Sequence, residues 1–261
     1  MFNKKNDYVI KTGITGEGQD YNIYIMNRNE KVAAYLLGFA AGFLGAQIMF
    51  ENIWASVIIG VLIGFFTQPI VNSFLFNRRK KTILLQFRDL MDSMSNSFSA
   101  GKNTPDAFAD AQHDMQLSYG NDAIITKEVT IILNGLHSNF TIEVLLKDLA
   151  ERTGIQDIKS FADTFSVCNR LGGNLKKIVA DTRDIIGNKI EIEMEIQTIV
   201  TSNKNEMNIM CIMPFVIVLS MHLVGTAVSA NTPANIMSKL FALVLLAVSY
   251  AVGKRITDIK V

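Results

Sequence analysis

Few side chains in this sequence are spaced as a catalytic or metal-binding group would require. His113 and His137 have no cysteine pair nearby, and Cys168 and Cys211 are the only cysteines, so neither a zinc site nor a disulfide framework is expected. The run 172–177 (GGNLKK) lacks the Gly-Lys-Ser/Thr ending of a phosphate-binding loop and follows an expected helix rather than a strand. We therefore expect no enzyme activity, no cofactor and no metal, and interpret this run as a boundary between helices.

The composition is typical of a membrane protein. Of the 261 residues, 49% are hydrophobic and 19% are charged, and the formal net charge is +1. The mean hydropathy of +0.25 is too high for a disordered chain and unusual for a soluble one. A nucleic-acid partner is not expected, because such binders carry an excess of basic residues.

Four apolar stretches predict four transmembrane helices, at 32–50, 53–76, 207–228 and 236–252. A helix needs about 20 mostly apolar residues to cross a bilayer. The first three stretches have that length, and the fourth is short but can extend into Ala234 and Asn235. The alternative is that they are buried helices of a large soluble protein, which their glycine-rich, nearly charge-free character disfavours.

The distribution of lysine and arginine predicts the orientation in the membrane. Nearly all of these residues lie before the first stretch, between the second and the third, or after the fourth. Because basic residues are enriched on the cytoplasmic side, we expect both termini and the central block 77–206 in the cytoplasm of a multi-pass inner-membrane protein. The expected division is a cytoplasmic segment 1–31, a hairpin 32–76, a helical domain 77–206, a hairpin 207–252 and a cytoplasmic tail 253–261.

Small residues within the expected spans predict close packing between helices. Gly38 and Gly42 are four residues apart, as are Gly60 and Gly64, and such pairs let helix backbones approach each other in lipid. Pro69 and Pro214 are expected to kink their helices. The polar residues of the spans allow two readings, a path for a small solute or hydrogen bonds between helices; they are Gln47, Gln68, Asn72 and His222.

The central block predicts a bundle of about six helices. Apolar residues recur every three or four positions from Ile83 onward, which is the helical period. Glycines and capping residues mark the ends of the helices. The run from Ser99 to Asn103 ends one helix, with Gly101 available as its C-cap, and Thr104 is expected as the N-cap of the next helix, with Pro105 at its first position and Asp106 in its first turn. Gly172-Gly173 ends a later helix, and Asn174 caps the last. The segment 190–196 alternates like a strand, but its flanks favour a helix with apolar residues on two sides. The fold class is therefore all-α, with four transmembrane helices and a cytoplasmic helical bundle.

Several of these segments, in their order and spacing, resemble the type II secretion system F domain family. The resemblance is to the platform proteins of Tad/Flp-type pili in the inner membrane, and it covers most of the chain. Its motifs are DYNIYIM (20–26), FRDLMDSM (87–94), SAGK (99–102) with Ala107-Phe108, DLAER (148–152), IKSFADTF (158–165), RLGGNL (170–175), Lys189-Ile-Glu191 with Glu195-Ile196, and Met213-Pro-Phe215.

The resemblance implies a mechanical role in assembling a Tad-type pilus or a type II secretion filament. Expected partners are a hexameric cytoplasmic ATPase, a second platform protein of the family, pilin subunits and membrane lipid, in an oligomer. Interaction or structural-corner roles are expected for Gly101, Asn103, Phe108, Phe161, Phe165, Gly172, Gly173, Asn174, Leu175, Glu191 and Glu195. The basic run Arg78, Arg79, Lys80 and Lys81 is interpreted as an anchor beside the membrane, with an ATPase contact as the alternative. A small-solute transporter or channel and a membrane-bound signalling enzyme stay as alternative functions.

Overall fold

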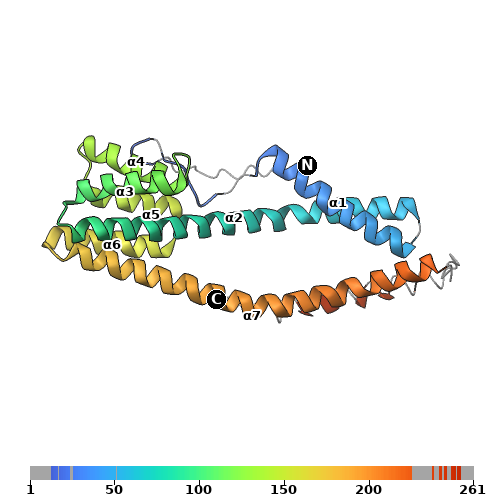
Figure 1. The fold of residues 1–261 in the computed structure, drawn as a ribbon. Coiled ribbons are helices and arrows are strands. Elements are labelled where there is room, and N and C mark those ends of the chain that lie inside the picture. The colour runs from blue at the N-terminus through green and yellow to red at the C-terminus, as the bar shows by residue number, and fades with distance from the viewer. Residues whose placement is uncertain are drawn as a thin grey trace. The chain divides into compact units, whose positions relative to one another are not determined.

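The computed structural model describes residues 13–16, 18–23, 26–50, 52–224 and a few positions between 237 and 253. Seven helices follow one another in this part of the chain, and no strand occurs among the described residues, as the sequence predicts (Figure 1). They are α1 (Arg28–Phe50), α2 (Ile53–Ser99), α3 (Thr104–Tyr119), α4 (Ile124–His137), α5 (Ile142–Thr153), α6 (Gln156–Leu171) and α7 (Leu175–Leu223).

The chain divides into two compact units. One comprises 1–25 and 73–190, and the other 26–72 and 191–261. The long helices α2 and α7 each contribute to both units, and neither is interrupted at the boundary. Val179, Ile186 and Ile190 of α7 are buried in the core of the helical unit, which reaches Ile190.

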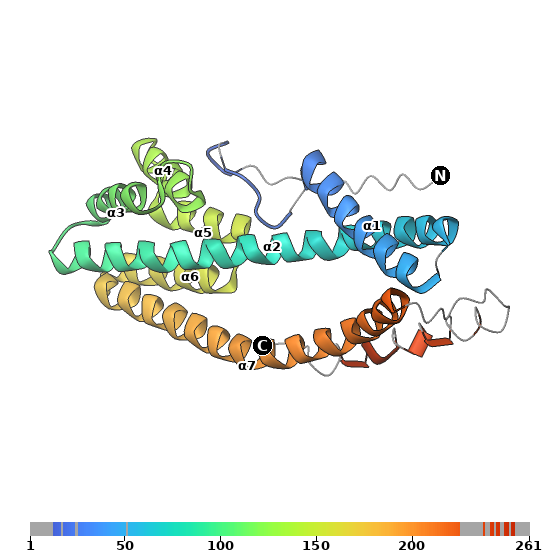
Figure 2. The same ribbon diagram turned by 45° about the vertical axis from the view of Figure 1, so that its right-hand side comes forward.

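The helical unit is built around the second half of α2. Helices α3 to α6 lie along this half, and the first part of α7 runs beside α6 (Figures 1 and 2). One face of α2 is fully buried, with Phe87, Met91 and Met94 each at 0% exposure. The sequence periodicity of this segment predicts that face, because residues three and four apart share one side of a helix. Helix α6 completes the centre of the core, where the rings of Phe87 and Phe161 lie 5.5 Å apart, edge to face.

Segment 190–196 is helical, and the strand alternative is excluded. Its apolar residues do not all find neighbours, however. Ile190 is buried, whereas Ile192 and Met194 are 53% and 52% exposed. Of these three residues only Ile190 belongs to the bundle core.

Helices α1 and α2 are long and apolar enough to cross a membrane, within Arg28–Ile48 and Ile53–Ser99. Their apolar side chains face outward: Trp54, Phe65 and Phe66 are 81%, 70% and 69% exposed. Four spans were expected. The third corresponds in the described residues to a shorter apolar segment of α7, Asn205–Met221. About half of the positions of the fourth, 236–252, lie outside the described residues.

Glycines bring α1 and α2 into close contact. A Cβ atom added to Gly38 would lie 3.0 Å from the Cα of Gly64, and one added to Gly42 would lie 3.2 Å from the Cα of Gly60. The two glycines of α2 also leave room for aromatic rings of α1. A Cβ at Gly60 would meet the ring of Phe39 at 3.1 Å, and one at Gly64 would meet the ring of Tyr35 at 3.1 Å.

One hydrogen bond joins polar side chains of the two helices, from the Ser56 hydroxyl to Gln47 Oε1 (3.0 Å). Pro69 and Pro214 lie inside α2 and α7, which continue past them.

Candidate functional site

The two glycine corners of the helical unit have the same construction. Gly101 and Gly172 have positive φ, +82° and +70°, and an asparagine caps the helix that follows each corner. Asn103 Oδ1 accepts a hydrogen bond from the Asp106 amide (2.9 Å), and Asn174 Oδ1 accepts one from the Lys177 amide (3.0 Å). The cap of α3 is thus Asn103 and not Thr104, which is already the first helical residue.

Replacing Gly172 with valine is expected to lower the free energy of unfolding by about 1 kcal/mol or somewhat more, because only glycine adopts positive φ without strain. No atom lies within 4 Å of the position of the new Cβ, so backbone strain is the sole expected cost. The measurement is pulse proteolysis of the full chain in detergent over a urea series. An unchanged midpoint would contradict the corner assignment.

The structure separates the other expected site residues into core and surface. Phe108, Phe161 and Phe165 are 0%, 2% and 0% exposed, so their positions serve packing rather than contact with a partner. Leu175 is half-buried against the same core. Glu191 and Glu195 are exposed on α7 and belong to the second unit. Gly173 approaches Cys168, whose Sγ would lie 3.0 Å from an added Cβ.

A buried arginine forms the most elaborate polar cluster of the helical unit. Arg152, near the end of α5, is 2% exposed. Its guanidinium binds both oxygens of Glu128 on α4, with Nη1–Oε1 and Nη2–Oε2 distances of 2.7 and 2.6 Å, and its Nε binds Asp148 Oδ2 at 2.7 Å. We call Glu128, Asp148 and Arg152 the Arg152 clamp. Two carboxylates around one guanidinium satisfy the requirement that a buried charge be paired and hydrogen-bonded.

The N-terminal segment lies on this clamp. We call residues 13–23 the strap; the structure describes 13–16 and 18–23 of it. The Tyr21 hydroxyl donates to Glu128 Oε1 (2.7 Å), the Tyr21 amide donates to the Arg152 carbonyl (2.8 Å), and the amide of Ile14 donates to Asp148 Oδ1 (3.1 Å). The described part of the strap belongs to the helical unit.

The basic run after the apolar part of α2 also meets the strap. The Arg79 guanidinium lies over the Tyr21 ring, 4.7 Å from its centroid, and donates a hydrogen bond to the Gln19 side chain (3.3 Å). Lys80 Nζ reaches Asn22 Oδ1 and the Gly154 carbonyl, each at 3.4 Å. Two of the four residues interpreted as a membrane anchor therefore hold the strap to the helices. The sequence alone gave no partner for them in this segment.

The clamp shifts the acid–base behaviour of its members. Burial, followed by the charge and hydrogen bond of Glu128, raises the pKa of the Tyr21 phenol well above its usual value. Burial by itself lowers the pKa of the Arg152 guanidinium, but the hydrogen bonds and charges of Glu128 and Asp148 outweigh it and raise that pKa. Tyr21 stays neutral and Arg152 stays charged at physiological pH.

The pKa of Tyr21 predicts an alkaline weakening of the strap. A phenol whose pKa is higher in the folded state contributes stability that is complete below its unfolded pKa, near 10, and is lost as the pH rises toward the folded value. Below pH 10 the wild type is therefore expected to be more stable than Tyr21→Phe, by about 1–3 kcal/mol for a hydrogen bond to a carboxylate. Above pH 10 the difference should shrink. Urea titrations of both proteins from pH 8 to 11 measure it, and a difference that grows with pH would contradict the assignment.

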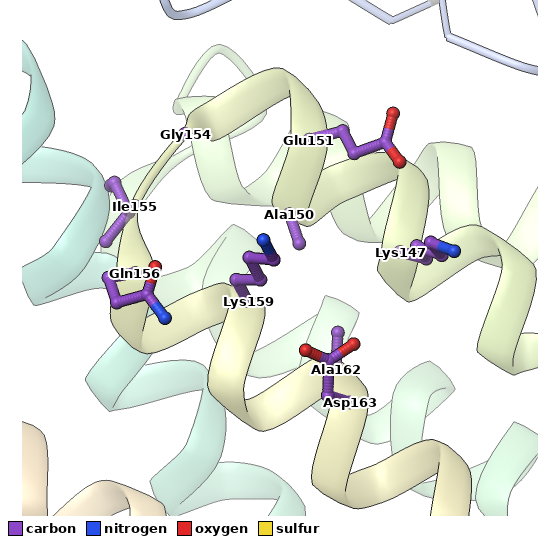
Figure 3. Close-up of a pocket in the computed structure, with 9 residues that line it drawn as sticks. All are labelled: Lys147, Ala150, Glu151, Gly154, Ile155, Gln156, Lys159, Ala162 and Asp163. Carbon is purple, nitrogen blue, oxygen red and sulfur yellow. The ribbon is translucent and has the colours of Figure 1, made fainter.

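A polar groove lies next to the clamp, where α5 turns into α6. Its volume is about 520 Å³. Figure 3 shows Lys147 and Glu151 on α5 beside Lys159 and Asp163 on α6. The small side chains of Ala150 and Ala162, both 3% exposed, lie among them (Figure 3). We call this the α5–α6 groove. The strap touches its edge, since Asn22 Nδ2 donates to the Glu151 carbonyl (2.9 Å).

The lining of the groove combines two lysines, two carboxylates and two buried alanines. In the part of the chain that the structure describes, no histidine, cysteine or serine lines it. No three His, Cys, Asp or Glu side chains of the described residues are grouped to hold a metal ion.

Sequence reasoning missed the clamp, although a signal for it exists. Arg152 follows Leu149 by three residues and thus continues the buried face that includes Leu145 and Leu146. Glu128 likewise lies between Ile125 and Val129 in a helix that is otherwise apolar on that side. A charged residue at an apolar position of each helix predicts a buried ion pair. The contribution of Tyr21 had no comparable signal.

Comparisons with known proteins found no match among family models, among curated proteins or among solved structures.

Proposed function

We propose that this protein is a non-enzymatic platform in the inner membrane for the assembly of a Tad-type pilus or a type II secretion filament. The observation that carries the proposal is the order of its elements. An apolar hairpin precedes a bundle of six helical segments, and a further apolar segment follows it. The sequence motifs that resemble the F domain family occur in the same order.

The proposed arrangement has four membrane spans and a cytoplasmic helical unit. The hairpin of α1 and α2 supplies two spans, and the apolar part of α7 with the segment 236–252 supplies the other two. The basic residues place both termini and the helical unit on the cytoplasmic side. In this arrangement the unit faces a hexameric ATPase, while the spans meet pilin subunits and a second platform protein.

Two unbroken helices support a mechanical role. Helix α2 runs for 47 residues from the apolar hairpin into the bundle core, and α7 runs for 49 residues from the bundle into an apolar segment. A continuous helix transmits displacement along its axis better than a flexible linker would. A motion of the helical unit driven by ATP hydrolysis in a partner would thus reach the spans through these two helices.

Crosslinking in the native membrane tests the proposed partners. The tagged full chain is crosslinked in its own cells, purified in mild detergent and analysed by mass spectrometry. A secretion ATPase, a pilin or a related platform protein, crosslinked to residues of the helical unit or the spans, is the expected result. Recovery of the chain alone in repeated experiments, from cells that are making filaments, would contradict the proposal.

A further inference from the structure

The Arg152 clamp keeps its form through contacts that do not involve the strap. Arg152 is bound by Glu128 from α4 and by Asp148 from one turn earlier in α5, at 2.6 and 2.7 Å. Because all three side chains belong to helices, the guanidinium stays paired when the strap leaves. The surface is therefore preorganised, which lowers the cost of ordering it when a segment binds.

This surface presents a set of polar groups that binds the strap, an irregular segment with a turn at 13–16. Glu128 and Asp148 accept hydrogen bonds from the Tyr21 hydroxyl and the Ile14 amide. Arg152 uses its carbonyl to accept from the Tyr21 amide, and its Nη1 donates to the Gln19 carbonyl at 3.3 Å. The contacts to the main chain recognise the backbone of the segment, and the contacts of Glu128 and Arg79 with Tyr21 supply selectivity for the side chain.

The strap contributes little to the hydrophobic core. Tyr21 is its one described residue in the core cluster, whereas the remaining members come from the helices. Elsewhere the strap approaches closely through glycine. A Cβ atom at Gly18 would lie 2.5 Å from the Arg152 Cζ, so no larger residue fits there while the clamp is closed. Most of the core cluster therefore lies within the helices, and Tyr21 is the contribution that release of the strap would remove.

We propose that the Arg152 clamp, with Arg79, is a peptide-binding site and that the strap is its releasable occupant. The site takes a segment that carries glycine three residues before a Tyr-Asn pair. Release of the strap opens the site and frees the Glu151 edge of the α5–α6 groove. This inference does not rest on the proposed function, because it concerns only contacts within the helical unit.

The test uses the full chain in detergent and the substitution Gly18→Ala. Alanine at this position collides with a guanidinium that two carboxylates hold in place, and it leaves every helix unchanged. Hydrogen exchange is expected to rise about 10- to 100-fold at the amides of Ile14 and Tyr21, with no change in the α6 core at 158–165. Gly101→Ala, at a corner with no atom within 4 Å of the added Cβ, is the control and should leave the strap protected.

A labelled synthetic peptide of residues 13–23 then probes the vacated site. It is expected to bind the Gly18→Ala chain at least about tenfold more tightly than the wild-type chain, because a tethered occupant competes at an effective concentration near the millimolar range. The same peptide with Tyr21→Ala should not bind. Two peptide results would overturn the proposal: equal binding to both chains, or no binding although the strap is released. Two exchange results would also overturn it: continued protection of the strap in Gly18→Ala, or exchange that rises equally in the α6 core. If the strap of a second copy occupies the site, labelled chains should exchange between oligomers. That result would overturn the proposal that the strap binds within its own chain.

Discussion

Replacing Arg152 with methionine is expected to lower the free energy of unfolding of the helical unit by about 3–5 kcal/mol. Removing one partner of a buried ion pair leaves the other charge uncompensated in a site of low dielectric constant. Here two carboxylates lose their partner at once, since Glu128 and Asp148 both bind the guanidinium. Pulse proteolysis of the full chain over a urea series measures the loss.

Two further variants separate the buried charge from the loss of a side chain. Arg170→Met removes an exposed arginine of α6 and should leave stability unchanged. The double variant Arg152→Met with Glu128→Leu should be less destabilised than Arg152→Met alone, because it no longer buries an unpaired Glu128. If the loss of unfolding free energy in the double variant equals the sum of the losses in the two single variants, the clamp stabilises the unit through packing and not through its paired charges.

Replacing Phe161 with alanine is expected to lower the free energy of unfolding by about 3–5 kcal/mol, the usual range for Phe→Ala in a core. Phe161 is 2% exposed and joins two other rings, with centroid distances of 5.5 Å to Phe87 and 5.4 Å to Phe165. Removing the ring leaves a cavity beside Phe87 and Phe165, and surrounding side chains usually relax into such a cavity only in part. Thermal unfolding of the full chain, followed by circular dichroism, measures the effect.

The matched control is Val167→Ala on the same helix. Val167 is 49% exposed, so its loss should change stability by less than about 0.5 kcal/mol. A partner-binding role for Phe161 predicts the opposite result, with little loss of stability and a loss of crosslinks to partners. That outcome would restore the interaction role expected from the sequence.

The all-α fold follows from the sequence because helix period and helix ends are local properties. The period of three and four places Phe87, Met91 and Met94 on one buried face, and the glycine at 172 marks a corner that needs positive φ. The N-cap of α3 was predicted at Thr104 and lies one residue earlier, at Asn103. Both residue types are good caps, and only the backbone geometry distinguishes them.

The contacts of the strap could not be predicted in the same way. They join residues more than a hundred positions apart, such as Tyr21 with Glu128 and Ile14 with Asp148. No periodicity specifies such pairs, because the strap has no helix or strand period of its own. The basic residues Arg79 and Lys80 also follow an apolar helix, where flanking charges are common, so their contact with the strap had no distinct pattern.

Counting surface filaments in a deletion strain tests the platform proposal most directly. The strain is complemented with the wild-type chain or with an empty vector, and filaments are counted by electron microscopy after immunolabelling of the pilin. We predict that filaments are absent from the deletion strain and return with the wild-type chain, while the pilin still accumulates in the membrane. Normal numbers of filaments in the deletion strain would contradict the proposal that this protein is their assembly platform.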